Sequence, residues 1–248
     1  MKKTLLMTGA LLALTCGLAF AGPGGLSLAW LDCDGGGAGG AHNRAFACNT
    51  NTGGGHTLVG SFIAPSFANA VTGFAAVVDL QAASVSYPDW WHIRVGGCRA
   101  TASLLSNFDF TGGPFTCYDY WQGGAVGGHS MDAPIANRAR IKATAALPAG
   151  DSRITSIPEG TEVYCFKLTA NNARTAGLGA CAGCPTSVCI VLNSILITNV
   201  PGNPAGNKFI SFPVANTATW QGGISDVECL NATPAKNSTW GQVKSLYR

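Results

Sequence analysis

The sequence predicts an all-β protein, a two-layer antiparallel β-sandwich stapled by disulfides. Three observations support this prediction: short apolar segments alternate with polar residues, turn residues separate these segments, and ten cysteines occur in 248 residues. No amphipathic helix of useful length lies between the segments, so a parallel sheet built from strand–helix–strand units is not expected. A strand with one apolar face needs an opposing layer, which a second sheet supplies.

The first half of the chain contains five candidate strands. Residues 26–30 place Leu26, Leu28 and Trp30 on one face, and residues 57–63 are rich in β-formers. Residues 74–80 carry an apolar side chain at every second position. Residues 91–95 alternate after the turn residues Pro88-Asp89, and residues 101–110 are a further candidate.

The second half contains five more candidate strands. Residues 137–146 alternate small or apolar side chains with Arg and Lys, and residues 164–168 place three apolar side chains on one face. Residues 190–198 are nearly all apolar, as expected of a central strand. Residues 209–214 and 217–220 complete the set. We find no internal repeat, so a single domain of this size is expected.

The N-terminus has the pattern of a signal peptide. Lys2 and Lys3 precede an apolar run over residues 5–20, which ends in the small-x-small pattern Ala19-Phe20-Ala21. We therefore expect residues 1–21 to be removed, residues 22–225 to form the sandwich, and residues 226–248 to form a tail. The location is then secreted, extracellular or periplasmic. The alternatives are a membrane anchor, for which the run is short, and a lipoprotein linked through Cys16, which Thr15 disfavours.

Nine cysteines remain after cleavage, and export makes disulfides the default interpretation. Local spacing favours the pairs Cys33–Cys48 and Cys98–Cys117, with a third bridge inside the segment that holds Cys181, Cys184 and Cys189. Because nine is odd, one thiol is left over, with Cys165 and Cys229 as candidates, and a disulfide-linked dimer is an alternative fate.

The Cys181-x-x-Cys184 pair has two further interpretations. A thioredoxin-like redox pair needs a helix N-terminus after a strand, whereas Pro185 and a β-rich run follow here. A zinc site needs further Cys or His ligands at matching spacing, and none appears. A structural disulfide is the favoured interpretation.

Composition and motifs exclude several functions. Charged residues make up only 11% and show no basic cluster, so nucleic-acid binding is not expected. Neither the HExxH nor the GxSxG motif occurs. His129, Ser130 and Asp132 resemble a catalytic triad, but adjacent residues of a strand point to opposite faces. A glycosidase would need two carboxylates, which Asp109 and Asp119 could supply. The chain is therefore not expected to be an enzyme.

Three local features suggest binding. Tyr118-Asp119-Tyr120-Trp121-Gln122 combines three rings with hydrogen-bonding side chains, as sugar-binding sites do, and Trp90-Trp91 could add a second platform. Asp32-Cys33-Asp34-Gly35 suggests a calcium loop, although further carboxylates are missing; no other cofactor is expected. In the tail, Thr239 could cap a short helix whose apolar face would carry Trp240, Val243, Leu246 and Tyr247 and dock on a partner.

Four segments resemble those of a group of uncharacterised secreted bacterial proteins. They are Gly179-Ala180-Cys181-Ala182-Gly183-Cys184, Val188-Cys189-Ile190-Val191-Leu192-Asn193, Pro88-Asp89-Trp90-Trp91 and the ending Thr-Trp-Gly-x-Val-Lys-x-Leu-Tyr-Arg. This resemblance implies no activity. The strand pattern is more loosely similar to cohesin-like and carbohydrate-binding sandwiches.

We therefore expect a structural, adhesive or interaction component of the cell exterior, with a glycan or a cell-surface protein as its partner. The alternatives are a carbohydrate-binding module and, third, a glycoside hydrolase.

Overall fold

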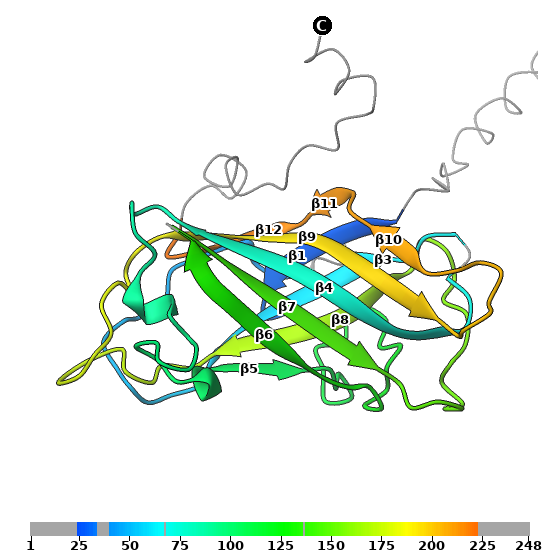
Figure 1. The fold of residues 1–248 in the computed structure, drawn as a ribbon, viewed down its shortest axis with the longest axis horizontal. Coiled ribbons are helices and arrows are strands. Elements are labelled where there is room, and N and C mark those ends of the chain that lie inside the picture. Colours follow the sequence, from blue (N-terminus) through cyan, green and yellow to red (C-terminus); the bar gives the residue numbers. More distant parts are fainter. Residues whose placement is uncertain (1–23, 34–39, 67, 136, 223–248) are drawn as a thin grey trace, which may run out of the picture.

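The computed structural model describes residues 24–33, 40–66, 68–135 and 137–222. These residues form two β-sheets that are stacked as layers (Figure 1). The all-β prediction is confirmed. Three expected features lie outside the described residues: the signal peptide, Asp34 of the calcium loop, and the tail with Trp240, Val243, Leu246 and Tyr247.

The first sheet has five strands in the order β11 (Pro213–Ala215), β1 (Gly25–Trp30), β3 (His56–Ile63), β8 (Glu162–Ala170) and β5 (Leu104–Asn107). All neighbours are antiparallel except β1 and β11, which are parallel. β5 covers only the C-terminal half of β8 and ends the sheet.

The second sheet has seven strands. Its main path is β2 (Asn43–Arg44), β12 (Thr217–Trp220), β9 (Val188–Asn199), β4 (Val71–Ala82), β7 (Arg138–Ala146) and β6 (Val126–Ile135), and β10 (Lys208–Ile210) pairs with β9. β2 and β12 are parallel. The expectation of a purely antiparallel sandwich is therefore wrong, because each sheet adds one parallel pair at an edge.

The hydrophobic core lies between the sheets. On β7, burial alternates strictly: Ala139, Ile141 and Ala143 are buried, whereas Arg140 and Lys142 face outward. A small interior cavity of about 20 Å³ is lined by residues of both sheets, among them Leu58 and Ile141. The period-2 pattern of the sequence therefore reports which face of each strand meets the other layer.

Three disulfides join segments that are far apart in the chain: Cys33–Cys117, Cys48–Cys184 and Cys98–Cys181. Cys189 is also disulfide-bonded. The expected local pairs Cys33–Cys48 and Cys98–Cys117 are wrong, and neither Cys181 nor Cys184 bonds within its own cluster. The sheets bring distant loops together at their ends, so proximity in space, and not in sequence, selects the partners.

Cys165 is the free cysteine of the described part of the chain, and it is fully buried in β8. Burial raises the pKa of its thiol well above the usual value. In this structure Cys165 cannot reach a second chain, so it does not support a disulfide-linked dimer.

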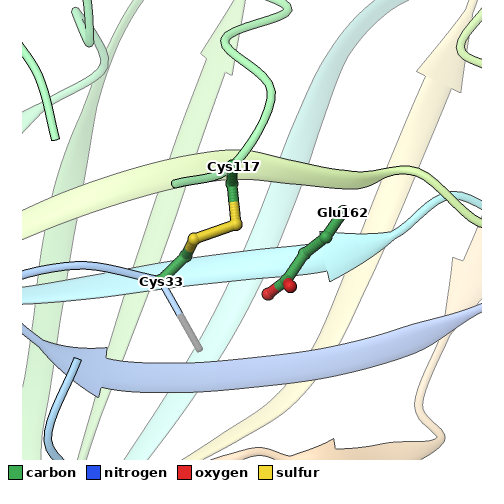
Figure 2. Close-up of side chains that lie close together, drawn as sticks. All are labelled: Cys33, Cys117 and Glu162. Carbon is green, nitrogen blue, oxygen red and sulfur yellow. A yellow bond between two sulfur atoms is a disulfide. The ribbon is translucent and has the colours of Figure 1, made fainter. Parts of the chain in front are cut away.

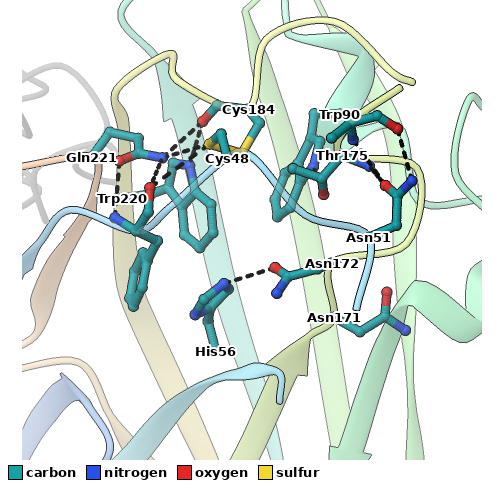
Figure 3. The surroundings of a disulfide bond; sticks show 12 residues. Cys48, Asn51, His56, Trp90, Asn171, Asn172, Thr175, Cys184, Trp220 and Gln221 are labelled. Atoms are coloured by element: carbon teal, nitrogen blue, oxygen red, sulfur yellow. Dashed lines mark hydrogen bonds between the residues drawn. A yellow bond between two sulfur atoms is a disulfide. The ribbon is translucent and has the colours of Figure 1, made fainter. Parts of the chain in front are cut away.

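An aromatic cluster closes the end of the sandwich beside Cys48–Cys184 (Figure 3). The ring of Trp220 stacks on Phe46 at 4.5 Å and on Trp90 at 4.7 Å, measured between ring centroids. The side-chain amide of Gln221 links the segments on either side of the cluster, because it donates hydrogen bonds to the backbone carbonyls of Phe46 and Cys184 at 3.1 Å each. Trp90 and Trp220 are fully buried and the partly buried Phe46 packs against the core, so these rings do not form a surface platform.

Two differences between the predicted and observed strands have opposite causes: one predicted strand is absent, and one observed strand was not predicted. Residues 91–95 are not a strand: a 3-10 turn, η2 (Asp89–Trp91), buries both Trp90 and Trp91 and leaves Val95 exposed. Strand β6 was missed because Gly127 and Gly128 remove the apolar alternation from its first half. Residues 101–110 contain only the short β5, preceded by a second 3-10 turn, η3 (Thr101–Ser103).

Among the described residues, no helix is long and apolar enough to cross a membrane.

Candidate functional site

A groove of about 570 Å³ runs beside β6, within the size range of ligand sites. Its described lining comprises Ile93, Arg94, Val95, Thr101, Ala102, His129, Ser130 and Met131. The last three are consecutive residues of β6. Since neighbouring side chains of a strand point to opposite faces, a groove that touches three in a row faces the edge of the strand and not one of its faces.

The edge position follows from the topology. β6 is the last strand of its sheet, and within the described residues it pairs only with β7. The edge strand of the other layer, β5, lies next to it (Figure 1). The groove therefore lies at the side of the sandwich where the edge strands of the two sheets, β6 and β5, are next to each other.

The opposite wall, residues 93–102, is held by a buried arginine. Arg99 is 0% exposed and donates hydrogen bonds to the carbonyls of Ala173 at 3.0 Å, Trp90 at 3.2 Å and Asn171. Its guanidinium carbon lies 3.8 Å from the centre of the Trp90 ring. Burial lowers the pKa of Arg99 to about 10, so it remains a cation at neutral pH.

The Cys98–Cys181 disulfide also holds this wall in place. Within the wall, Ile93 and Arg99 form an isolated β-bridge, which brings the two ends of the segment between them together. The wall is therefore tied to the loop after β8 by one covalent bond and by the hydrogen bonds of Arg99. A surface fixed in this way loses little conformational entropy on binding.

Two polar side chains of the groove are chemically distinctive. Arg94 is half-buried, its Nε atom is buried without a hydrogen-bond partner, and it forms no ion pair with any described residue. His129 Nδ1 lies 3.0 Å from Ser106 Oγ on β5. Burial lowers the pKa of His129, so the imidazole is neutral at pH 7. Arg94 is then the only charged residue in the described lining.

The His129–Ser106 pair does not form a catalytic triad. The nearby acid, Asp132, is 3.0 Å from Lys142 Nζ in an exposed ion pair, and Ser130 is exposed. Nδ1 of His129, which an orienting carboxylate would occupy, contacts the serine itself. The role of Ser106 could not be found from the sequence, because β5 and β6 belong to different sheets.

The aromatic segment that was expected to bind sugars is divided by the fold. Trp121 and Tyr120 are 0% and 2% exposed, and their polar atoms bond to the backbone: Trp121 Nε1 donates to the Tyr164 carbonyl at 2.6 Å. The expectation of an exposed ring platform does not hold for these two residues. Tyr118 remains 45% exposed, with Asp119 half-buried and Gln122 exposed beside it.

Asp109 and Asp119 lie close enough to influence each other. Burial raises the pKa of Asp119, with a smaller contribution from Asp109, while hydrogen bonds from Thr111 lower the pKa of Asp109. A nearby ammonium group, Lys167, lies 4.7 Å from the centre of the Phe110 ring. The pKa values of the two carboxylates are thus shifted in opposite directions, and neither residue lines either of the two described cavities.

Cys33, Cys117 and Glu162 are the one group of described residues close enough to hold a metal ion, with potential ligand atoms within 4.8 Å of one another. Figure 2 shows the two sulfurs bonded to each other and the Glu162 carboxylate pointing toward them. Disulfide sulfurs are not the thiolates that metals bind, so in this form the group offers a single carboxylate.

The expected calcium ligand Asp32 is already engaged. Its carboxylate accepts hydrogen bonds from the hydroxyls of Tyr164, at 2.7 Å, and Thr116, and from the Cys33 amide. Both oxygens therefore have protein partners. The remaining candidate acid of that loop, Asp34, lies outside the described residues.

Comparison of the chain with protein-family models, curated proteins and solved structures gives no match.

Proposed function

We propose that this chain is a non-catalytic binding module of the cell exterior, which engages its partner through the groove beside β6. The observation that carries the proposal is Arg94, a half-buried cation that forms no ion pair with a described residue, in the wall of a groove of about 570 Å³. A guanidinium without a counter-charge in a groove wall can pair with an anionic group of a ligand.

Two further features support a binding role. The wall is fixed by Arg99 and the Cys98–Cys181 bond, as suits a preformed site. The disulfides also suit an oxidising compartment, the setting in which such bonds persist.

The test uses the full chain with its disulfides formed, on a glycan array and against a displayed peptide library. Two exposed valines provide a matched pair: Val95 lines the groove and is 92% exposed, whereas Val85 lies outside it and is 96% exposed. Ligands should be retained by the wild type and by Val85→Asp, and should bind at least tenfold more weakly to Val95→Asp. The proposal is overturned if neither panel yields a ligand, or if both variants retain it equally.

A second candidate function is carbohydrate binding by the exposed part of the aromatic segment. Tyr118 is 45% and Phe115 79% exposed, and both belong to the loop that carries Asp119. Flat rings next to a carboxylate suit the apolar face and hydroxyls of a sugar. On the same array, Tyr118→Ala together with Phe115→Ala should abolish glycan retention, while Val95→Asp leaves it intact. Retention by the double variant would exclude this surface.

A further inference from the structure

The form of the groove indicates what kind of partner fits it. An edge strand leaves every second pair of its backbone N–H and C=O groups without a strand partner. The described lining residues His129, Ser130 and Met131 place this edge along one side of the groove. A ligand in the groove therefore meets a row of peptide hydrogen-bonding groups.

The side chains along this edge leave the backbone accessible. Gly127 and Gly128 precede His129 and carry no side chain, and Ser130 is small and exposed. His129 turns toward Ser106 on β5 and so stays between the layers. These residues would allow another extended chain to approach the edge of β6 at strand spacing, about 4.8 Å.

The charge of the groove indicates which extended peptides would bind it best. Arg94 is its only charged described lining residue, and none of those residues is acidic. Arg94 is half-buried and forms no ion pair with a described residue, and a guanidinium pairs best with a carboxylate, which it can hold through two parallel hydrogen bonds. The occupant should therefore carry an Asp or Glu side chain opposite Arg94.

The geometry points to strand addition: we propose that an extended peptide segment of a partner protein pairs with the free edge of β6 and places an acidic side chain against Arg94. This inference rests on the proposed function and specifies its partner. The main-chain hydrogen bonds would supply affinity, and Arg94 with the apolar wall of Ile93 and Val95 would supply selectivity.

The first experiment pans a random dodecapeptide display library on the full chain, with counter-selection on Arg94→Gln. Selected peptides should contain Asp or Glu at a common position, flanked by β-formers, and should bind Arg94→Gln at least tenfold more weakly. The variant should melt no lower than the wild type, because Arg94 forms no side-chain hydrogen bond or ion pair with a described residue and its buried Nε has no partner to lose. The absence of acidic enrichment, or of any selected peptide, overturns the inference.

The second experiment tests whether the backbone pairs. A selected peptide is compared with a version N-methylated at alternate amides and with one in which Gln replaces the acidic residue. N-methylation in one of the two registers should abolish binding, and the peptide should slow hydrogen exchange in β6. The Gln peptide should bind wild type and Arg94→Gln equally.

The remaining outcomes separate this inference from the function on which it rests. If acetate alone displaces the peptide, or if N-methylation in both registers is tolerated, the groove binds a ligand but not a strand, and only the inference fails. If sedimentation shows a dimer that Val95→Asp dissociates, the occupant is a second copy of this chain, and the inference again fails. If no glycan and no peptide binds the groove, both fail.

Discussion

His129 Nδ1 lies 3.0 Å from Ser106 Oγ, and this contact joins the edge strand of one sheet to the edge strand of the other. It forms where β5 and β6 end their layers side by side, next to the groove. The contact sets the position of the imidazole and places a titratable group between the sheets, where protonation is disfavoured.

Stability should therefore fall as the pH is lowered. Burial lowers the pKa of both His129 and His56 in the folded state, so below the unfolded value of about 6.5 the unfolded chain binds more protons than the folded one. The free energy of unfolding, measured by urea denaturation at pH 7.5, 6.5 and 5.5, should decrease along this series. His129→Gln, which keeps a hydrogen-bonding side chain, should show a shallower decrease. An equal slope in this variant would show that His129 does not contribute.

Arg99 should be the most sensitive arginine of the chain to conservative replacement. Arg99→Lys removes the guanidinium group, and with it the hydrogen bonds to three backbone carbonyls and the contact with the Trp90 ring. The substitution should lower the free energy of unfolding by about 3 kcal/mol or more. The control is Arg140→Lys, in a pair with Asp79 in which the arginine is half exposed and the carboxylate is mostly buried, where a smaller loss of about 1 kcal/mol is expected. Equal losses in the two variants would contradict the structural role given to Arg99.

Two disulfides provide a matched comparison, because Cys33–Cys117 and Cys98–Cys181 span 84 and 83 residues. Replacing either pair by Ala should cost about the same stability, roughly 4.5 kcal/mol in the chain-entropy model. Only the loss of Cys98–Cys181 should speed hydrogen exchange over residues 93–102, because this disulfide is the one of the two that is attached to the groove wall. The expectation is wrong if both variants expose that wall equally.

Cys165 should not react in the folded protein. It is fully buried and its thiol pKa is raised, so both access and thiolate formation are suppressed. Alkylation with iodoacetamide at pH 8 should leave Cys165 unmodified in the native state and label it in 6 M guanidinium chloride, as read by peptide mass mapping. Native labelling at the rate of a free thiol would show that β8 opens or that the residue is accessible.

The alternation of apolar side chains in the sequence determined most of the strands. Leu26, Leu28 and Trp30 repeat every second residue because one face of a strand must be buried, and this requirement is local. The same local signal is absent where glycines replace side chains, as in β6, and it misleads where two adjacent rings enter the core from a turn, as at Trp90 and Trp91. The strand edge that lines the groove was therefore not predictable.

For the cysteines too, the sequence indicated the kind of bond, whereas the tertiary structure decided the partners. The sequence indicated that these cysteines form bonds, because their number and the predicted export signal favour oxidation. It did not determine that Cys48 meets Cys184 across a separation of 136 residues, since this depends on which strand ends are stacked.

The sequence alone thus determined the class of fold and the covalent chemistry, which depend on residue type and local periodicity. The tertiary structure alone decided which side chains meet. It buried Tyr120 and Trp121, left Tyr118 exposed, and brought Arg94, His129 and Ser106 to one edge. The physical reason is that the order of strands in a sheet and the stacking of two sheets are set by long-range packing, which no short segment of the chain records.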